Sequence, residues 1–179
     1  MEFELIYKNE PLRLCDDFTD VGYMADNFEA MDFFGNLLEI KRSHANKAMT
    51  LLVSFPIYND DFKDEILKLD AFLSHLQVEV YCYLIFDFMI PEAIVLQNRL
   101  TKFKLLFDTE NEFGSMYGTK IVNGSLKDRL TKSLFLISKD GAIFYIDMPK
   151  DLDKSLDFDH LQIELNRAYT VYTGVGCHG

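Results

Sequence analysis

The residues that could act as strong nucleophiles in this chain are three cysteines, at positions 15, 82 and 177. They form no Cys-x-x-Cys pair, and an odd count in a reducing compartment favours free thiols. Cys82 lies within an apolar segment, which predicts a buried structural thiol. Cys177 is followed by His178, and a neighbouring histidine can lower the pKa of a thiol. We therefore take Cys177 as the candidate reactive thiol.

Charged residues mark a second candidate site, where an apolar run ends at Phe55-Pro56 and a helix is expected to begin. Asp60 and Asp61 could act as an acid and base pair. Their position instead favours one as the helix N-cap and the other as a solvated acid of the first turn. Lys63 could bind an anion together with the distant Lys132. The alternative for these two residues is a pair of surface lysines.

Other chemical motifs are missing. The four histidines are scattered without His-x-x-His or His-Glu-x-x-His spacing, so we expect no bound metal. Neither the glycine-rich patterns of nucleotide-binding loops nor the Gly-x-Ser-x-Gly pattern of serine hydrolases occurs. We therefore expect no cofactor.

The overall charge narrows the range of partners. The 179 residues carry a formal net charge of −11, which disfavours nucleic acids and anionic membranes. No apolar run reaches the roughly 20 residues of a membrane span, and the first residues lack a signal-peptide pattern. We expect a cytoplasmic protein with a single domain over 1–179, in which 173–179 form a flexible tail.

Hydrophobic patterning predicts the elements that position these residues. Alternation over 2–14 predicts a β-hairpin turning at 9–11, and a short strand is expected at 28–31. Residues 48–55 are continuously apolar, as in a strand buried on both faces. The apolar residues that follow recur at helical spacing, which predicts an amphipathic helix to about residue 77.

The same patterns predict the rest of the chain. We expect the remaining elements at 78–86 (central strand), 93–100 (helix), 103–107 (edge strand), 111–117 (helix), 133–138 and 142–147 (hairpin strands) and 158–172 (helix). Asp140-Gly141 between two apolar runs is a strong hairpin signal. This order predicts an α/β fold of the thioredoxin-like type, with helices on both faces of a mixed central sheet and an N-terminal β-hairpin.

Four segments of the chain are similar to motifs of one protein family, in the same order and at nearly the same spacing. Residues 3–14 are similar to the family's opening F-x-G-N-P-V-x-L hairpin, and residues 22–28 to its G-x-x-A-x-x-F segment. Ser54-Phe55-Pro56 is similar to the end of N-I-F-P. The most specific block is 113–127, similar to F-x-x-x-Y-G-V-x-I-x-x-G-P-L-K. Taken together, these segments resemble the bacterial thiol peroxidases, the atypical two-cysteine branch of the peroxiredoxins. The resemblance implies a peroxiredoxin-type three-layer α/β/α fold.

The family's active-site pattern, P-x-x-x-T-x-x-C with a distant Arg, implies where functional residues would fall in this chain. Pro56 matches the Pro, whereas Asp60 stands at the Thr position, Lys63 at the peroxidatic Cys and Lys132 at the Arg. The position of the resolving Cys falls on Thr101. A thiolate is the nucleophile in this chemistry. The resemblance therefore implies a scaffold that has lost both redox cysteines.

Three functions are compatible with these observations. The first is a thiol-peroxidase-like pseudoenzyme, an enzyme-like protein without the activity, that keeps a binding or interaction role. The second is a thiol-dependent oxidoreductase that uses Cys177 or Cys82. The third is a module that binds a small anion in the old pocket, rimmed by Pro56, Tyr58, Lys63 and Lys132.

We also expect a homodimer, because the resembled family dimerises through a face that includes the turn after the active-site strand and the helix that here carries Phe113 and Tyr117. In this chain that region is rich in apolar and aromatic residues, which suggests a covered surface. These residues are Phe55, Ile57, Tyr58, Phe62, Phe88, Met89, Phe113, Met116 and Tyr117. Besides a second copy, a protein partner or a small anionic ligand is possible.

Overall fold

The computed structural model describes residues 4–15 and 18–171. The elements in chain order are β1 (Glu4–Tyr7), β2 (Glu10–Arg13), β3 (Phe28–Asp32), β4 (Leu37–Ile40), β5 (Met49–Ser54), α1 (Asp60–Ser74), β6 (Val80–Phe86), α2 (Ala93–Arg99), β7 (Lys104–Phe107), α3 (Glu112–Met116), β8 (Ser133–Ile137), β9 (Ile143–Asp147) and α4 (Phe158–Thr170). The order agrees with the sequence prediction and adds strand β4. The predicted tail at 173–179 lies outside the described residues.

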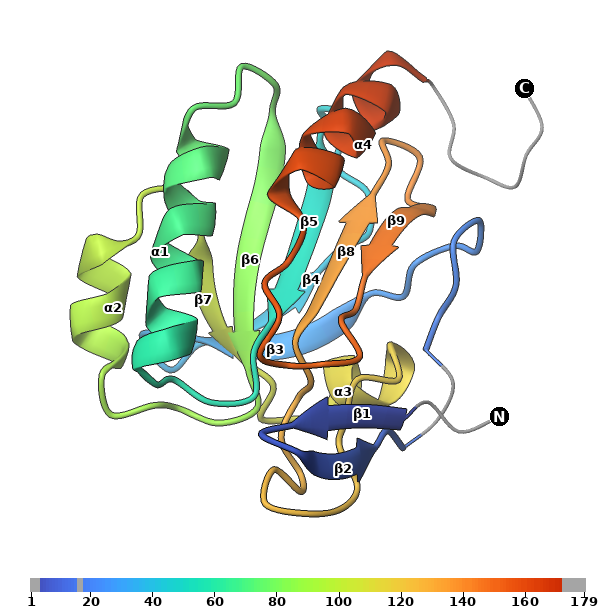
Figure 1. The fold of residues 1–179 in the computed structure, drawn as a ribbon. Coiled ribbons are helices and arrows are strands. Elements are labelled where there is room, and N and C mark those ends of the chain that lie inside the picture. Colours follow the sequence, from blue (N-terminus) through green and yellow to red (C-terminus); the bar gives the residue numbers. More distant parts are fainter. Residues whose placement is uncertain (1–3, 16–17, 172–179) are drawn as a thin grey trace.

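A seven-stranded mixed sheet forms the centre of the molecule, in the order β4-β3-β7-β6-β5-β8-β9. Strands β5, β6 and β7 run parallel, because α1 and α2 connect them as crossovers. Figure 1 shows α1, α2 and α4 in front of this sheet. Two hydrophobic clusters fill its two sides, with α1 and α4 residues in one and Phe113 of α3 in the other. The predicted three-layer α/β/α fold with a mixed sheet is confirmed.

Strand β5 shows how the sequence builds the centre of the sheet. All six of its residues are buried, as the continuous apolar run predicts for a central strand. Leu51 and Val53 belong to the cluster under α1 and α4, whereas Leu52 belongs to the cluster under α3. Alternation along the strand therefore supplies apolar side chains to both layers.

The N-terminal hairpin is confirmed, but its turn lies earlier than predicted. Tyr7 pairs with Glu10, so the turn residues are Lys8 and Asn9. Both have positive φ, 47° and 67°, as a two-residue type I′ turn requires. Pro11 lies in β2 instead of the turn, where a two-stranded sheet tolerates its missing N–H.

Three details of the predicted elements are wrong. Strand β7 is not an edge strand, because it pairs with β6 on one side and with β3 on the other. The N-cap of α1 is neither Asp60 nor Asp61 but Asn59, whose side-chain oxygen accepts a hydrogen bond from the Phe62 N–H at 2.9 Å. Both aspartates are first-turn acids, and the helix ends at Ser74 instead of residue 77.

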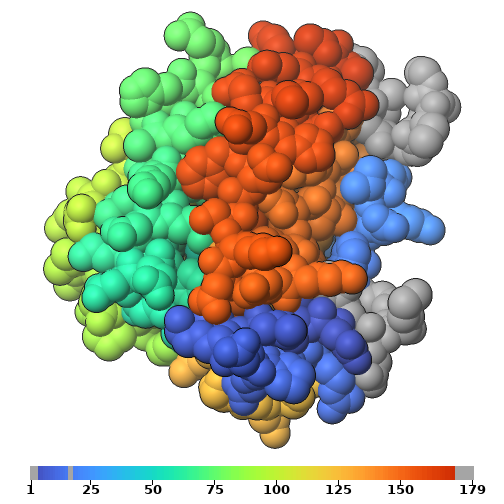
Figure 2. Space-filling view, in the orientation of Figure 1, coloured from blue at the N-terminus to red at the C-terminus, as the bar shows by residue number. Residues whose placement is uncertain are grey.

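The segment between β9 and α4 runs across the front of the molecule. In the space-filling view it lies between α1 and the N-terminal hairpin (Figure 2). Backbone hydrogen bonds join it to β1, from the Ile6 N–H to the Lys150 oxygen at 2.7 Å and from the Leu152 N–H to the Ile6 oxygen at 2.9 Å. Among the described residues, no helix combines the length and apolar character needed to cross a bilayer.

Candidate functional site

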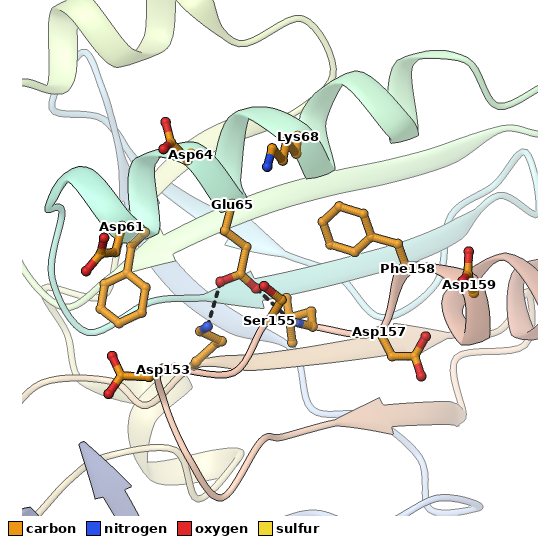
Figure 3. A pocket seen from close by; sticks show the side chains of 12 residues that line it. Asp61, Asp64, Glu65, Lys68, Asp153, Ser155, Asp157, Phe158 and Asp159 are labelled. Atoms are coloured by element: carbon orange, nitrogen blue, oxygen red, sulfur yellow. Dashed lines mark hydrogen bonds and ion pairs between the residues drawn. The ribbon is translucent and has the colours of Figure 1, made fainter. Parts of the chain in front are cut away.

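A cavity of about 710 Å³ opens between the first turns of α1 and the segment that leads into α4 (Figure 3). It contains Lys132, one of the residues that the sequence singles out. The lining residues are Asp61, Phe62, Asp64, Glu65, Lys68, Lys132, Asp153, Ser155, Leu156, Asp157, Phe158 and Asp159. We call this space the Lys132 cavity.

Lys132 lines the cavity and is 1% exposed. Its ammonium group donates to the Glu65 carboxylate at 2.6 Å and to the Lys154 carbonyl at 2.8 Å. The same nitrogen lies 5.6 Å from the centre of the Phe55 ring and 5.0 Å from that of Phe62, within the range of cation–π attraction. The charge is therefore surrounded by partners from the chain itself.

Glu65 holds the other half of this buried pair. It lies on the apolar face of α1, between Phe62 and Leu69 in helical spacing, where a carboxylate needs a partner to be tolerated. One oxygen accepts from Lys132 and the other from the Leu156 N–H at 2.7 Å. The pair thus fastens the segment before α4 onto α1, as the dashed contacts in Figure 3 show.

The interpretation of Lys132 as a surface lysine is wrong. The residue precedes the buried strand β8 and its partner Glu65 is 67 residues away in the chain, a contact that local patterning does not reveal. The signal that could have been used is the carboxylate itself. Glu65 interrupts the apolar face of α1, and a buried acid requires a cation nearby.

The other positions implied by the resemblance do not line this cavity. Pro56 is buried at the end of β5, Asp60 is exposed and Lys63 is half-buried in the first turn of α1. Thr101 is exposed, and its N–H donates to Asp70 near the far end of α1 at 2.8 Å. The predicted rim of Pro56, Tyr58, Lys63 and Lys132 is therefore not the lining of this cavity.

The Lys132 cavity is acidic. Its lining holds six carboxylates and two lysines, and one of those lysines, Lys132, is already paired with Glu65. Like charges around the rim repel a small anion. The described residues therefore offer no support for anion binding at this place.

The described thiols lie elsewhere. Cys82 points into the core from β6, and burial raises the pKa of its thiol to about 12. Cys15 is half-buried, and its sulfur donates to the Gly114 carbonyl at 3.9 Å. Cys177, the candidate reactive thiol, lies outside the described residues. Neither Cys15 nor Cys82 lines the Lys132 cavity.

The aromatic surface proposed for a dimer is mostly interior. Phe55, Phe62, Phe113 and Tyr117 are at most 2% exposed, so they pack in the protein's own core and are not available to a partner. Ile57, Tyr58 and Phe88 are half-buried, and only Met89 and Met116 of the predicted set are exposed.

No protein-family model matches this chain, and no curated protein matches it. Solved structures do match. A peroxiredoxin-like protein from Aquifex aeolicus superposes with a TM-score of 0.84 at 14% identity, over 93% of this chain and 97% of that one. A thiol peroxidase from Chromobacterium violaceum gives a TM-score of 0.81 at 18% identity, over 94% and 98%.

More distant structures give the same result. Peroxidoxin BcpB from Mycobacterium tuberculosis superposes with a TM-score of 0.64 at 15% identity, over 87% of this chain and 99% of that one. At such identities the agreement establishes the fold alone. The molecule has the peroxiredoxin-type thioredoxin-like fold, as the sequence resemblance implies.

Proposed function

We propose that this chain is a thiol-peroxidase-like protein that has lost peroxidase chemistry and acts by binding. The observation that carries the proposal is the first turn of α1, where the resemblance aligns the peroxidatic cysteine with Lys63. No cysteine occurs between Cys15 and Cys82. Without a thiolate at this position the scaffold has no nucleophile for a peroxide.

The buried ion pair supports the same proposal. An arginine in the family polarises peroxide, and the aligned residue here is Lys132. Its ammonium group is 1% exposed and bound to Glu65, and a lysine lacks the planar fork of arginine. The position of the nucleophile therefore holds a lysine, and the positive group of the resembled site is engaged in an ion pair with Glu65.

A thiol-dependent oxidoreductase is the alternative, through Cys177 or Cys82. Burial disfavours Cys82, because a thiol with a pKa of about 12 is almost entirely protonated at neutral pH. For Cys177 only the adjacent His178 offers support.

Peroxide consumption in the presence of a recycling reductant tests the proposal. With dithiothreitol or with thioredoxin and its reductase, we expect turnover equal to a protein-free blank. A thiol peroxidase assayed beside it shows that the reagents work. Turnover above the blank that disappears on alkylation contradicts the proposal, and comparison of Cys177→Ser with Cys82→Ala then identifies the thiol.

The acidic rim of the Lys132 cavity indicates the kind of partner that would suit the binding role. Besides the paired Glu65, five carboxylates line this cavity, and the exposed Lys8 lies near two of them, Asp61 and Asp153. This excess of negative charge favours a basic protein segment over a small anion. Anisotropy of a labelled oligolysine peptide measures this preference, and binding that falls with salt and with Asp61→Asn plus Asp153→Asn supports it. Equal binding to these variants contradicts it.

We further propose that the protein acts in the cytoplasm as a homodimer.

A further inference from the structure

A second cavity lies where β3 separates from β7. The ladder between these strands covers two residue pairs and ends at Asp32. Beyond it, a space of about 400 Å³ lies between the β3–β4 turn, the start of β7 and the end of α2. This volume falls within the range of small-molecule sites. It shares no lining residue with the Lys132 cavity.

One wall of this cavity is a turn with a fixed shape. The buried Asp32 accepts hydrogen bonds from the Phe34 N–H at 2.9 Å and from the Asn36 N–H at 2.8 Å. Gly35, with φ of +87°, closes the turn by donating to the Asp32 carbonyl at 3.1 Å. Asp32 is thus occupied by the backbone of the turn, and the turn holds its aromatic residues in place.

Of the two aromatic residues in this turn, Phe33 is half-buried and Phe34 is open to solvent. Phe34 is 80% exposed, although its ring contacts the Phe33 ring at a centroid distance of 4.8 Å. The buried Phe103 lines the same cavity from the side of β7. A solvent-exposed aromatic ring beside a cavity with an aromatic wall is typical of a surface that packs against a ligand.

The polar groups of the cavity are mainly donors. Lys102 and Lys104 line it, and neither ammonium group forms a hydrogen bond or ion pair with any described residue. The amide of Gln97 is occupied, since its oxygen accepts from the Leu105 N–H at 3.1 Å. Lys104 also attracts the Asp32 carboxylate across the cavity, whereas Lys102 has no acidic partner among the lining residues. Two cations against one carboxylate, beside aromatic walls and in a chain of net charge −11, favour an anion with an apolar body.

We propose that this second cavity binds a small aromatic carboxylate. The planar ring packs between Phe34 and Phe103, and the carboxylate accepts charge-assisted hydrogen bonds from Lys102 and Lys104. This inference is independent of the peroxidase chemistry discussed above. It places anion binding at the start of β7 instead of at Lys132.

Three probes that differ in charge test the proposal. Naphthalene-2-carboxylate, naphthalene-2-methanol and 2-naphthylmethylamine are titrated at low salt by ligand-observed NMR and calorimetry. We expect the carboxylate to bind about tenfold more tightly than the alcohol, as one charge-assisted contact provides, and the amine to bind more weakly still. Phe34→Ser and Lys104→Gln should each reduce the affinity for the carboxylate about fivefold or more.

Matched controls separate this site from general surface effects. Ile163→Ser and Lys127→Gln change an exposed apolar residue and an exposed lysine elsewhere, and should leave the affinity unchanged. Unfolding curves establish that all four variants fold. Equal binding of the three probes, equal affinity in all variants, or no binding of the carboxylate at millimolar concentration overturns the proposal. A change of oligomeric mass in Phe34→Ser also overturns it, because Phe34 would then be a contact between copies.

Discussion

Lys132 and Glu65 satisfy each other's charge in the interior, with backbone groups of Lys154 and Leu156 completing the set. Removing one partner of a buried pair leaves the other charge without compensation, which destabilises a protein more than the pair stabilised it. The pair therefore makes the attachment of the α4 segment to α1 depend on both side chains.

Replacing Lys132 by Met tests the strength of this attachment. We expect Lys132→Met to lower the free energy of unfolding by about 3–5 kcal/mol, because Glu65 remains buried without its cation. Adding Glu65→Gln should restore part of the loss. Urea unfolding measures both changes. Lys68→Met, on an exposed position of the same helix, is the control and should change stability by roughly 0.5 kcal/mol or less.

The buried carboxyl of Asp108 makes the stability of the protein depend on pH. Desolvation raises the pKa of this carboxyl from 3.8 to about 6, although it accepts hydrogen bonds from the Phe113 and Gly114 N–H groups. Between pH 3.8 and about pH 6, the Asp108 carboxyl is therefore mostly protonated in the folded state and mostly ionised in the unfolded state. The contribution of Asp108 to stability therefore increases as the pH falls from 7 towards 4.

Comparison with Asp108→Asn isolates this contribution. Relative to the variant, the wild-type protein should gain roughly 1 kcal/mol of unfolding free energy between pH 7 and pH 5. Unfolding midpoints measured in both proteins at each pH give the difference. Parallel pH profiles for the two proteins would show that Asp108 titrates as an ordinary exposed carboxyl.

At the scale of elements, α1 begins where a polar side chain caps it. Asn59 accepts from the Phe62 N–H, and its amide nitrogen donates to the Tyr7 hydroxyl at 3.2 Å. The helix start is therefore tied to the N-terminal hairpin. The sequence Asn59-Asp60-Asp61 contains three residues that are all able to cap a helix, so residue type alone did not select the correct one.

Asn59→Ala should remove both contacts. We expect a loss of about 1 kcal/mol, the usual effect of deleting an N-cap side chain, measured by urea unfolding. Asn166→Ala, at an exposed position within α4, should be neutral because alanine favours helix interiors. If Asn59→Ala is as neutral as Asn166→Ala, the cap does not stabilise α1.

Strand pairing is a feature of the fold that local sequence patterns do not predict. The apolar residues of 103–107 predicted a strand at β7, but they did not predict that this strand lies between β6 and β3 in the sheet. The partner β3 lies more than seventy residues earlier in the chain and contributes two ladder pairs. Local alternation reports which face of a strand is buried and says little about its neighbours. The same limit hid the contact between Lys132 and Glu65.

At the scale of the whole molecule, the fold was predictable because many weak signals agreed. Continuous apolar strands, amphipathic helices and the Asp140-Gly141 turn indicate the same layered arrangement, and the resemblance gave its type. The residues at the surface were harder to predict from the sequence. Four aromatic residues expected at a dimer surface are buried, since apolar composition does not distinguish a core from an interface.

Oligomeric state is testable at this scale. We expect a homodimer, with Met89 and Met116 as exposed apolar residues of the contact. Light scattering at micromolar concentration should give twice the chain mass, and Met89→Asp plus Met116→Asp should reduce it to one chain. Ile163→Asp is the control on α4. A wild-type mass of one chain contradicts the expectation.

The reaction of the reduced protein with hydrogen peroxide, followed over a single turnover without a recycling reductant, tests the loss of peroxidase chemistry most directly. It removes any dependence on the choice of reductant. We predict that peroxide disappears no faster per thiol than with free cysteine, and that a variant lacking Cys15, Cys82 and Cys177 differs only by this slow background. A rapid phase in the wild-type protein that is absent from this variant would contradict the prediction.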